Sequence, residues 1–231
     1  MRRLLALILL AVGVDALAAP VLLSEDFNNI ATLPGSGWIQ TNNSSPIGTT
    51  QWFQGNSGIF PSQAGAPDAY IAANFLNADT GGNISNWLIT PVVTLANGEV
   101  FSFYTRTEVG IPFPDRLEVR LSTNTTFADV GGTATSVGDF TTLLLAINPT
   151  LAVGGYPEDW TQFSITLSGL GAGVSSGRFA FRYFVTDTNS NADYIGIDSV
   201  LVSTVPEPSK FVLCAVALSI LGFARRRRQH A

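Results

Sequence analysis

The side chains that could do chemistry in this 231-residue chain are mostly carboxylates. The only histidine is His230 and the only cysteine is Cys214, both near the C-terminus, and the stretch 19–204 contains no lysine. A Ser-His-Asp or Cys-His catalytic arrangement, a His/Cys zinc site and a Schiff base therefore cannot be assembled in that stretch. Carboxylate and carbonyl oxygens remain, and these are the ligands that calcium and magnesium prefer.

The stretch 19–204 is strongly acidic. It holds five arginines against fifteen Asp and Glu residues, a net charge of −10, whereas the whole chain carries −5. A surface of that sign repels phosphate backbones, so no nucleic-acid partner is expected.

Two pairs of carboxylates could in principle serve glycoside hydrolysis, which needs carboxyl groups about 5–9.5 Å apart. They are Glu108 with Asp115, and Glu158 with Asp159. No further feature marks either pair as a catalytic site, and Glu158-Asp159 beside Trp160 also suits a solvated turn. The sequence predicts a protein that is not an enzyme, with a carbohydrate-active enzyme using paired carboxylates as the alternative.

The elements that must position these side chains are strands. Apolar or aromatic residues alternate with polar ones with a period of two, which is typical of half-buried strands; the runs are 101–105, 117–121, 163–167 and 179–185. Glu118 and Arg120 share one strand face, as surface charges or cross-strand partners. Asn97-Gly98, between apolar runs, indicates a hairpin. The sequence predicts an all-β fold, an antiparallel jelly-roll β-sandwich over 19–204.

Oxygen ligands at the two ends of this domain suggest a calcium site. Glu25 and Asp26 belong to the first predicted strand and Asp198 to the last. The terminal strands of a jelly roll are commonly neighbours, so these carboxylates could converge on a structural Ca²⁺, and Asn74 could add a further oxygen. The alternative is a set of solvated or hydrogen-bonded carboxylates without a metal.

Tryptophan side chains could bind a sugar by stacking, or they could pack in the core. The segment 28–69 is rich in glycine and reads as long surface loops pinned by tryptophans. Trp52 lies between polar Gln51 and Gln54 and close to glycines, so it is the candidate for an exposed, ligand-binding ring.

The N-terminal segment 1–18 has the features of a secretory signal peptide. Arg2 and Arg3 precede a compact apolar run, and Ala16-Leu17-Ala18 supplies small residues at a cleavage site. The apolar run is shorter than the ~20 residues of a membrane span. We therefore expect export of the chain with cleavage after Ala18.

The C-terminal segment 205–231 has three parts: the box Val205, Pro206, Glu207 and Pro208, a single apolar helix over 211–224, and the cluster Arg225, Arg226, Arg227 and Arg228. In this order the three parts resemble the PEP-CTERM sorting signal of Gram-negative bacteria. The arginines should stay cytoplasmic by the positive-inside rule. The resemblance implies that an exosortase in the inner membrane recognises the box and processes the tail. A plain membrane anchor is the alternative.

A second resemblance covers most of 23–202. The blocks that carry it are Glu25-Asp26-Phe27, Gly37-Trp38, Tyr70 to Phe75, Asn86 to Pro91 and Ile195 to Val200. This series is similar to the choice-of-anchor J domain, which is related to cleaved-adhesin and MAM-like jelly rolls. The family usually has a second acid after the closing aspartate, where this chain has Ser199. The resemblance implies that related domains hold a structural Ca²⁺ in this region.

Together these features predict a non-catalytic protein exported through the inner membrane of a Gram-negative bacterium. It would be anchored in that membrane transiently, processed by an exosortase and delivered to the cell surface or extracellular matrix. The expected role is adhesion or matrix interaction, with polysaccharide as a possible ligand. A purely structural matrix component is a further alternative, because a jelly roll supports many functions.

Overall fold

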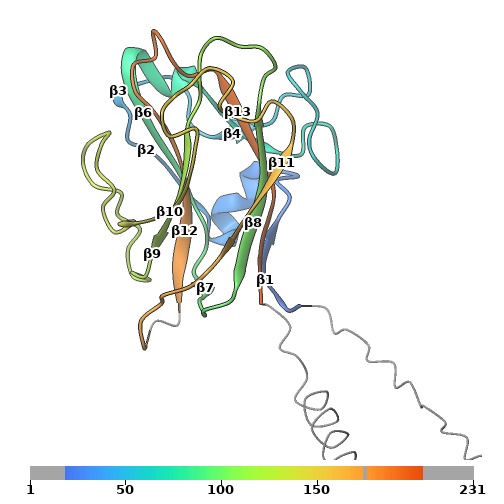
Figure 1. The fold of residues 1–231 in the computed structure, drawn as a ribbon, viewed down its shortest axis with the longest axis vertical. Helices are drawn as coiled ribbons and strands as arrows, with labels where there is room; N and C mark the ends of the chain where they lie inside the picture. The colour runs from blue at the N-terminus through green and yellow to red at the C-terminus, as the bar shows by residue number, and fades with distance from the viewer. Residues whose placement is uncertain (1–18, 174–175, 205–231) are drawn as a thin grey trace, which may run out of the picture. The chain divides into compact units, whose positions relative to one another are not determined.

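The computed structural model describes residues 19–173 and 176–204 (Figure 1), so the predicted signal peptide and sorting segment lie outside the described residues. Val21–Thr204 form one compact unit. Within the described ranges, no helix is both long enough and apolar enough to cross a membrane. The elements are β1 (Val21–Glu25), η1 (Ile30–Ser36), β2 (Ile39–Asn42), β3 (Ser45–Ile47), β4 (Phe53–Gln54), β5 (Ile71–Asn74), η2 (Phe75–Asn77), β6 (Ala78–Ile89), β7 (Val93–Thr94), β8 (Val100–Thr107), β9 (Leu117–Ser122), β10 (Thr142–Ile147), β11 (Thr161–Thr166), β12 (Ser176–Val185) and β13 (Tyr194–Ser203).

The strands form two facing sheets (Figure 1). One sheet has six strands in the order β11-β8-β13-β5-β4, with β1 also paired to β13. The other has seven strands in the order β10-β9-β12-β6-β2, with β3 paired to β6 and β7 to β12. Every recorded pairing is antiparallel. The predicted all-β antiparallel sandwich is confirmed.

Strand β13 sets the long axis of the six-stranded sheet. Its first residue, Tyr194, pairs with Asn74 of β5, and its last, Ser203, pairs with Val21 of β1. At about 3.3 Å per residue, these two pairs lie roughly 30 Å apart. The described chain therefore enters and leaves the sandwich at one end, while β5 runs into η2 at the other. The expectation that the first and last strands are neighbours is confirmed.

The core lies between the sheets and is built largely from the alternating runs seen in the sequence. Phe101 and Phe103 of β8 and Phe179 and Phe181 of β12 are fully buried. Phe101 stacks on Phe179 with ring centroids 4.2 Å apart. Phe103 meets Phe181 edge to face at 4.8 Å. Facing aromatic rings of this kind bury large apolar areas and fix the separation of the two sheets.

Loops also cover the outer face of each sheet. On the six-stranded sheet, Phe60 packs with Tyr70 and Tyr194, and Trp160 packs against the same group. On the seven-stranded sheet, Phe140 packs against Trp87. Trp38 and Trp52 belong to the main core, whereas Trp87 and Trp160 each pack in a smaller cluster on the outer face of a sheet.

The predicted hairpin at Asn97-Gly98 is wrong. Strands β6 and β7 lie in the seven-stranded sheet, whereas β8 lies in the six-stranded sheet. The turn instead passes from one sheet to the other. Gly98 adopts a φ of 96°, and the Asn97 side chain accepts a hydrogen bond from the Leu170 N–H at 2.9 Å. The sequence therefore identified a turn at Asn97-Gly98 correctly, but the turn is hydrogen-bonded to a distant segment at Leu170 and does not join two paired strands.

Glu118 is a cross-strand partner of Arg182 on β12 rather than a surface charge. Glu118 is buried and contacts both Arg120, at 2.7 Å, and the fully buried Arg182, at 3.1 Å. The two guanidinium groups hold the pKa of Glu118 below its usual value although burial alone would raise it. The Arg182 guanidinium also lies over the Trp87 ring, 4.9 Å from its centre. The outer face of this sheet thus hides an ionic cluster.

Candidate functional site

Asp198 is held by backbone amides and does not face other ligands. Its Oδ2 accepts hydrogen bonds from the N–H groups of Gln63 and Ala64, at 2.8 and 3.2 Å, and its Oδ1 accepts one from Ser199 at 2.6 Å. Burial raises the pKa of Asp198 to about 6, against the opposing effect of these hydrogen bonds. The carboxylate fastens the loop before β5 to the outer face of the six-stranded sheet.

The strand register brings Glu25 close to Asp198, because Glu25 of β1 pairs with Val200 of β13. Glu25 Oε1 accepts a hydrogen bond from the Phe27 N–H at 2.8 Å, and Asp26 is exposed. Asn74 lies at the opposite end of β13, paired with Tyr194. Within the described ranges, no three His, Cys, Asp or Glu side chains are grouped as a metal site would require. Backbone N–H groups thus use part of the acceptor capacity of Asp198, and the calcium site at Glu25, Asp26, Asn74 and Asp198 stays a prediction.

The interpretation of Trp52 as an exposed stacking ring is wrong. Its side chain is 2% exposed and belongs to the main core. It lies with Trp38 beneath η1, at the floor of an open groove of about 550 Å³ whose rim includes Pro34, Gln40 and Gln51. No ring face of Trp52 is available for stacking.

The carboxylates considered for glycoside hydrolysis are not placed for it. Asp115 is 1% exposed, and its oxygens accept hydrogen bonds from Tyr183, Thr107 and the Asp193 N–H. The cavity beside Asp115 and Glu108 holds about 10 Å³, room for about one water molecule. Burial, and then the neighbouring carboxyl groups, raises the pKa of Asp193 to about 7. A sugar cannot reach this cluster.

The second pair serves the fold. Glu158 Oε1 accepts a hydrogen bond from the Gly110 N–H at 3.0 Å, and the Glu158 carbonyl accepts one from Arg106. Asp159 is exposed and its carbonyl accepts a hydrogen bond from the Thr161 hydroxyl at 3.0 Å. These contacts tie the loop before β11 to the end of β8. The contacts of Glu158 and Asp159 do not direct the two carboxylates toward a common substrate position.

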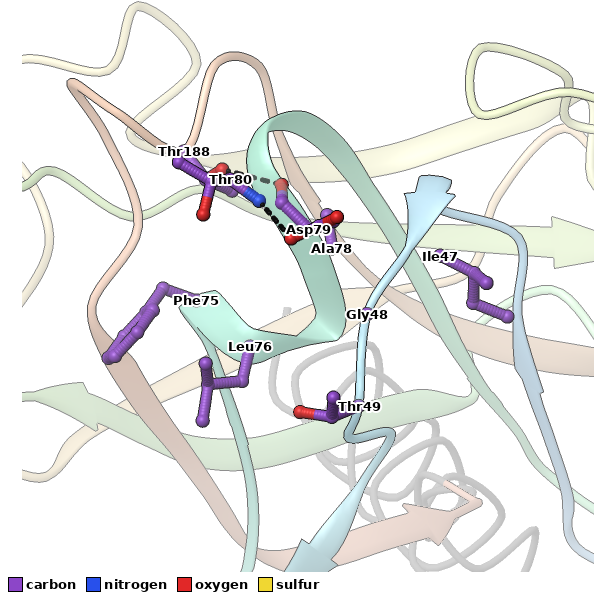
Figure 2. Close-up of a pocket in the computed structure, with 9 residues that line it drawn as sticks. All are labelled: Ile47, Gly48, Thr49, Phe75, Leu76, Ala78, Asp79, Thr80 and Thr188. Carbon is purple, nitrogen blue, oxygen red and sulfur yellow. Dashed lines mark hydrogen bonds between the residues drawn. The ribbon is translucent and has the colours of Figure 1, made fainter.

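A depression at the η2 end of the sandwich has the character of a binding site (Figure 2). It has a volume of about 380 Å³, within the usual range of small-molecule pockets. Its lining consists of Ile47, Gly48, Thr49, Phe75, Leu76, Ala78, Asp79, Thr80 and Thr188.

The lining divides into apolar and polar parts. Ile47, Phe75 and Leu76 form the apolar part and are exposed to 64%, 44% and 42%. Figure 2 shows Asp79 and Thr188 grouped on one side and Phe75 on another. The Thr188 hydroxyl donates to the Asp79 carbonyl at 3.0 Å, and the Thr80 N–H donates to Asp79 Oδ1 at 2.8 Å. An exposed aromatic ring beside hydroxyl and carboxylate oxygens can bind a ligand that has an apolar face and polar edges.

Asn74 positions the apolar part. It is the N-cap of η2, and its Oδ1 accepts hydrogen bonds from the Leu76 N–H at 3.1 Å and the Thr50 hydroxyl at 3.0 Å. The capped helix begins directly after β5, so Phe75 and Leu76 leave the strand. Both side chains are exposed. The side chain expected to bind calcium therefore orients the aromatic ring of the depression.

Beneath η2 lies a network of buried amides. Asn77 is completely buried and donates to the Thr50 hydroxyl at 2.9 Å and to the Gln51 carbonyl at 3.2 Å. Its Oδ1 accepts a hydrogen bond from the Asn86 amide at 3.1 Å. Asn42 donates to the Asn77 carbonyl at 2.8 Å. The network joins β2, β6 and the segment after β3, and so fixes the floor of the depression.

Gly48 allows two walls of the depression to meet. A Cβ atom there would lie 2.1 Å from the Leu76 carbonyl oxygen and 2.8 Å from the Ala78 backbone. The close approach permits the Gly48 and Thr49 N–H groups to donate to the carbonyls of Asn77 and Leu76, at 3.1 and 2.9 Å. Any side chain at this position would force the segment after β3 away from η2.

Comparison with known proteins places the fold. No protein-family model matches the chain, and no curated protein matches it. The K1 cleaved adhesin domain of Lys-gingipain from Porphyromonas gingivalis W83 is similar, with 23% identity, a TM-score of 0.53, and coverage of 80% of this chain and 99% of that one. The K3 domain of the same protein gives 22% identity, a TM-score of 0.52, and coverage of 81% and 99%. The chain therefore shares the two-sheet sandwich fold of these cleaved adhesin domains.

Sequence reasoning did not select the residues that line the depression. Phe75 closes the Tyr70–Phe75 block and Asp79 follows η2, but the sequence does not show that a cap exposes them. Thr188 comes from the loop before β13, which meets β6 only in the fold. The available signal was Asn74-Phe75, an N-capping residue followed by a large apolar residue.

Proposed function

We propose that the chain is an exported, non-catalytic protein of the bacterial cell surface or extracellular matrix whose depression binds saccharide units of a polysaccharide. The single observation that carries the binding role is Phe75, which is exposed to 44% and lines the same depression as Asp79 and Thr188. The face of a sugar ring is apolar and its edge carries hydroxyl groups, so it matches an aromatic platform flanked by oxygen acceptors and donors.

The position of the depression supports a role in contact with another surface. It lies at the η2 end of β13, roughly 30 Å from the pair Val21–Ser203, where the chain enters and leaves the sandwich. A domain attached through its C-terminal end would present the opposite end outward. Adhesion or matrix binding makes use of a surface in that position.

Sorting is the second part of the proposal. The box Val205, Pro206, Glu207 and Pro208, together with Arg225 to Arg228, supports recognition by an exosortase after export. Mass spectrometry of the protein from a native host, with and without the exosortase, tests this part. We expect a C-terminus near Pro206 to Lys210 that is lost in the deletion strain. An intact arginine cluster in both strains would instead indicate a plain membrane anchor.

Binding is tested by calorimetric titration of the intact chain with a panel of short oligosaccharides. Replacing Phe75→Ala should weaken binding about tenfold, which corresponds to about 1.4 kcal/mol. Phe127→Ala is the matched control, because Phe127 is 67% exposed on a loop that does not line the depression. If no oligosaccharide binds, the chain is better described as a structural matrix component. If both variants bind as the wild type does, the saccharide site lies elsewhere.

A further inference from the structure

The arginines of the described domain are all used in internal contacts. Arg116 donates to the carbonyls of Phe184 and Pro149, and Arg178 donates to that of Thr90. Arg106 donates to the carbonyls of Thr107 and Glu158, while its guanidinium lies over the Phe60 ring at 4.5 Å.

The two remaining arginines belong to the buried ionic cluster. Arg120 and Arg182 both contact Glu118, at 2.7 and 3.1 Å. None of the five arginines lines the depression, and the stretch 19–204 contains neither lysine nor histidine. An anionic sugar in the depression would therefore meet no cationic side chain there.

Asp79 gives the depression a negative charge of its own. It is exposed and is the only ionisable residue that lines the depression. Its Oδ1 accepts the Thr80 N–H at 2.8 Å, and in the described part of the chain its Oδ2 has no hydrogen-bond partner. The free oxygen is therefore available to a ligand donor in a depression that the hydroxyl-bearing residues Thr49, Thr80 and Thr188 also line.

The net charge of the domain also favours cationic over anionic ligands. Fifteen carboxylates against five arginines produce a negative field, which concentrates cations near the surface and repels anions. Uronic acids and sulfated or phosphorylated sugars would be repelled at a distance and would find no cationic side chain of the described domain on contact.

From these observations we infer that the depression prefers a saccharide bearing a free amino group, whose ammonium pairs with Asp79, over neutral and acidic saccharides. This inference rests on the proposed function, since it names the chemical class of ligand for the same site. An ammonium group supplies donors that match the free Asp79 Oδ2 and the threonine hydroxyls.

Three trisaccharides of equal length test the inference by calorimetry on the intact chain: β-1,4-linked glucosamine, its fully N-acetylated counterpart, and galacturonic acid. We expect the amine to bind roughly two- to fivefold more tightly than the N-acetylated sugar, the range of an exposed ion pair. The uronate should bind more weakly than either. The preference for the amine should shrink as salt is added, because screening weakens exposed charge pairs.

Two charge-matched variants separate the depression from the general field. Asp79→Asn should abolish the preference for the amine while keeping the binding of the N-acetylated sugar, since an amide oxygen can still accept the Thr80 N–H. Asp68→Asn removes an equal charge from an exposed aspartate outside the depression and should leave the preference intact.

The outcomes distinguish the preference for an amine from the saccharide site itself. If the amine and the N-acetylated sugar bind equally and both are lost in Phe75→Ala, the saccharide site stands and the amine preference is wrong. If Asp68→Asn reduces the preference as much as Asp79→Asn, the preference belongs to the overall charge and the inference is overturned. If none of the three sugars binds, both the inference and the proposed saccharide site fail.

Discussion

Replacement of Asn77 by alanine removes the centre of the amide network under the depression. The variant loses two donated hydrogen bonds, to the Thr50 hydroxyl and the Gln51 carbonyl, and the one accepted from Asn86. Asn86 is completely buried, and its Oδ1 has no hydrogen-bond partner even in the intact network. After the change the whole side-chain amide of Asn86 is buried without a partner.

The free energy of unfolding should fall by about 3–5 kcal/mol. The two lost hydrogen bonds, to Thr50 and Gln51, contribute about 1 kcal/mol each, because water can reach these partners after the change. The Asn86 amide, buried without a partner, costs a further ~1–3 kcal/mol. For a domain of this size the melting temperature should drop by roughly 10 °C. Ligand binding should weaken too, because Asn77 ends η2 and holds the floor of the depression.

Urea denaturation of the intact chain, followed by tryptophan fluorescence, measures this change. Asn28→Ala is the control, since Asn28 is exposed and its side chain makes no hydrogen bond in the described part of the chain; it should alter stability by less than about 0.5 kcal/mol. A double-mutant cycle with Asn86→Ala should give a coupling of at least about 1 kcal/mol. A loss below about 1 kcal/mol for Asn77→Ala, or a coupling near zero, would refute the role of the network.

Further predictions concern charge and close packing. Burial raises the pKa of Asp198 to about 6 and that of Asp193 to about 7, so the folded protein binds these protons more tightly than the unfolded chain does. The stability that these protons contribute is complete below about pH 4 and is lost as the pH rises through 6 to 7, so the melting temperature should fall between pH 5 and pH 8. Asp193→Asn should flatten this decline. A melting temperature that rises over the same range would contradict the prediction. If Glu25, Asp26 and Asp198 hold Ca²⁺, the melting temperature should be higher in calcium than in chelator, and coinciding melting curves would contradict the predicted site. Glu118→Ala leaves the charge of Arg182 buried without its partner and should cost about 3–5 kcal/mol in urea denaturation, whereas a loss under 1 kcal/mol would mean that water reaches the cluster. Gly48→Ala should lower the melting temperature and abolish oligosaccharide binding together, and unchanged binding would show that the wall can move.

The sequence carried enough information to predict the class of fold. Period-two runs became β8, β9, β11 and β12 because alternate residues in each run face the core. The pairing of β1 with β13 followed from the usual topology of such sandwiches. The short strands between η1 and β5 were missed, since segments of two to four residues contain too little alternation to detect.

Burial was harder to predict than strand position. Trp52 has polar neighbours in sequence, yet the fold places it beneath η1. Glu118 alternates as a surface residue would, yet the loop before β10 covers its face of the sheet: the buried Arg182 that contacts Glu118 donates to the Ala134 carbonyl. In both cases the side chain is covered by a segment between strands for which the sequence predicts no regular structure.

The candidate site depends on contacts between segments far apart in the chain. Thr188 reaches Asp79, and Gly48 approaches Leu76, only because the loop before β13 and the segment after β3 meet at η2. Single-sequence patterns report neighbours along the chain, so they offer Asn74 as a capping residue but do not show that the capped turn leaves Phe75 exposed.

The most direct test of the central claim is to map where a saccharide binds. The backbone amide signals of the intact, isotope-labelled chain can be followed by NMR while the glucosamine trisaccharide is added. We predict shifts that concentrate on the depression, above all at Leu76, Asp79, Thr80 and Thr188, and that disappear in Phe75→Ala. Shifts that instead concentrate on the groove over Trp52, or on the outer faces of the sheets, would contradict the assignment of the depression as the binding site.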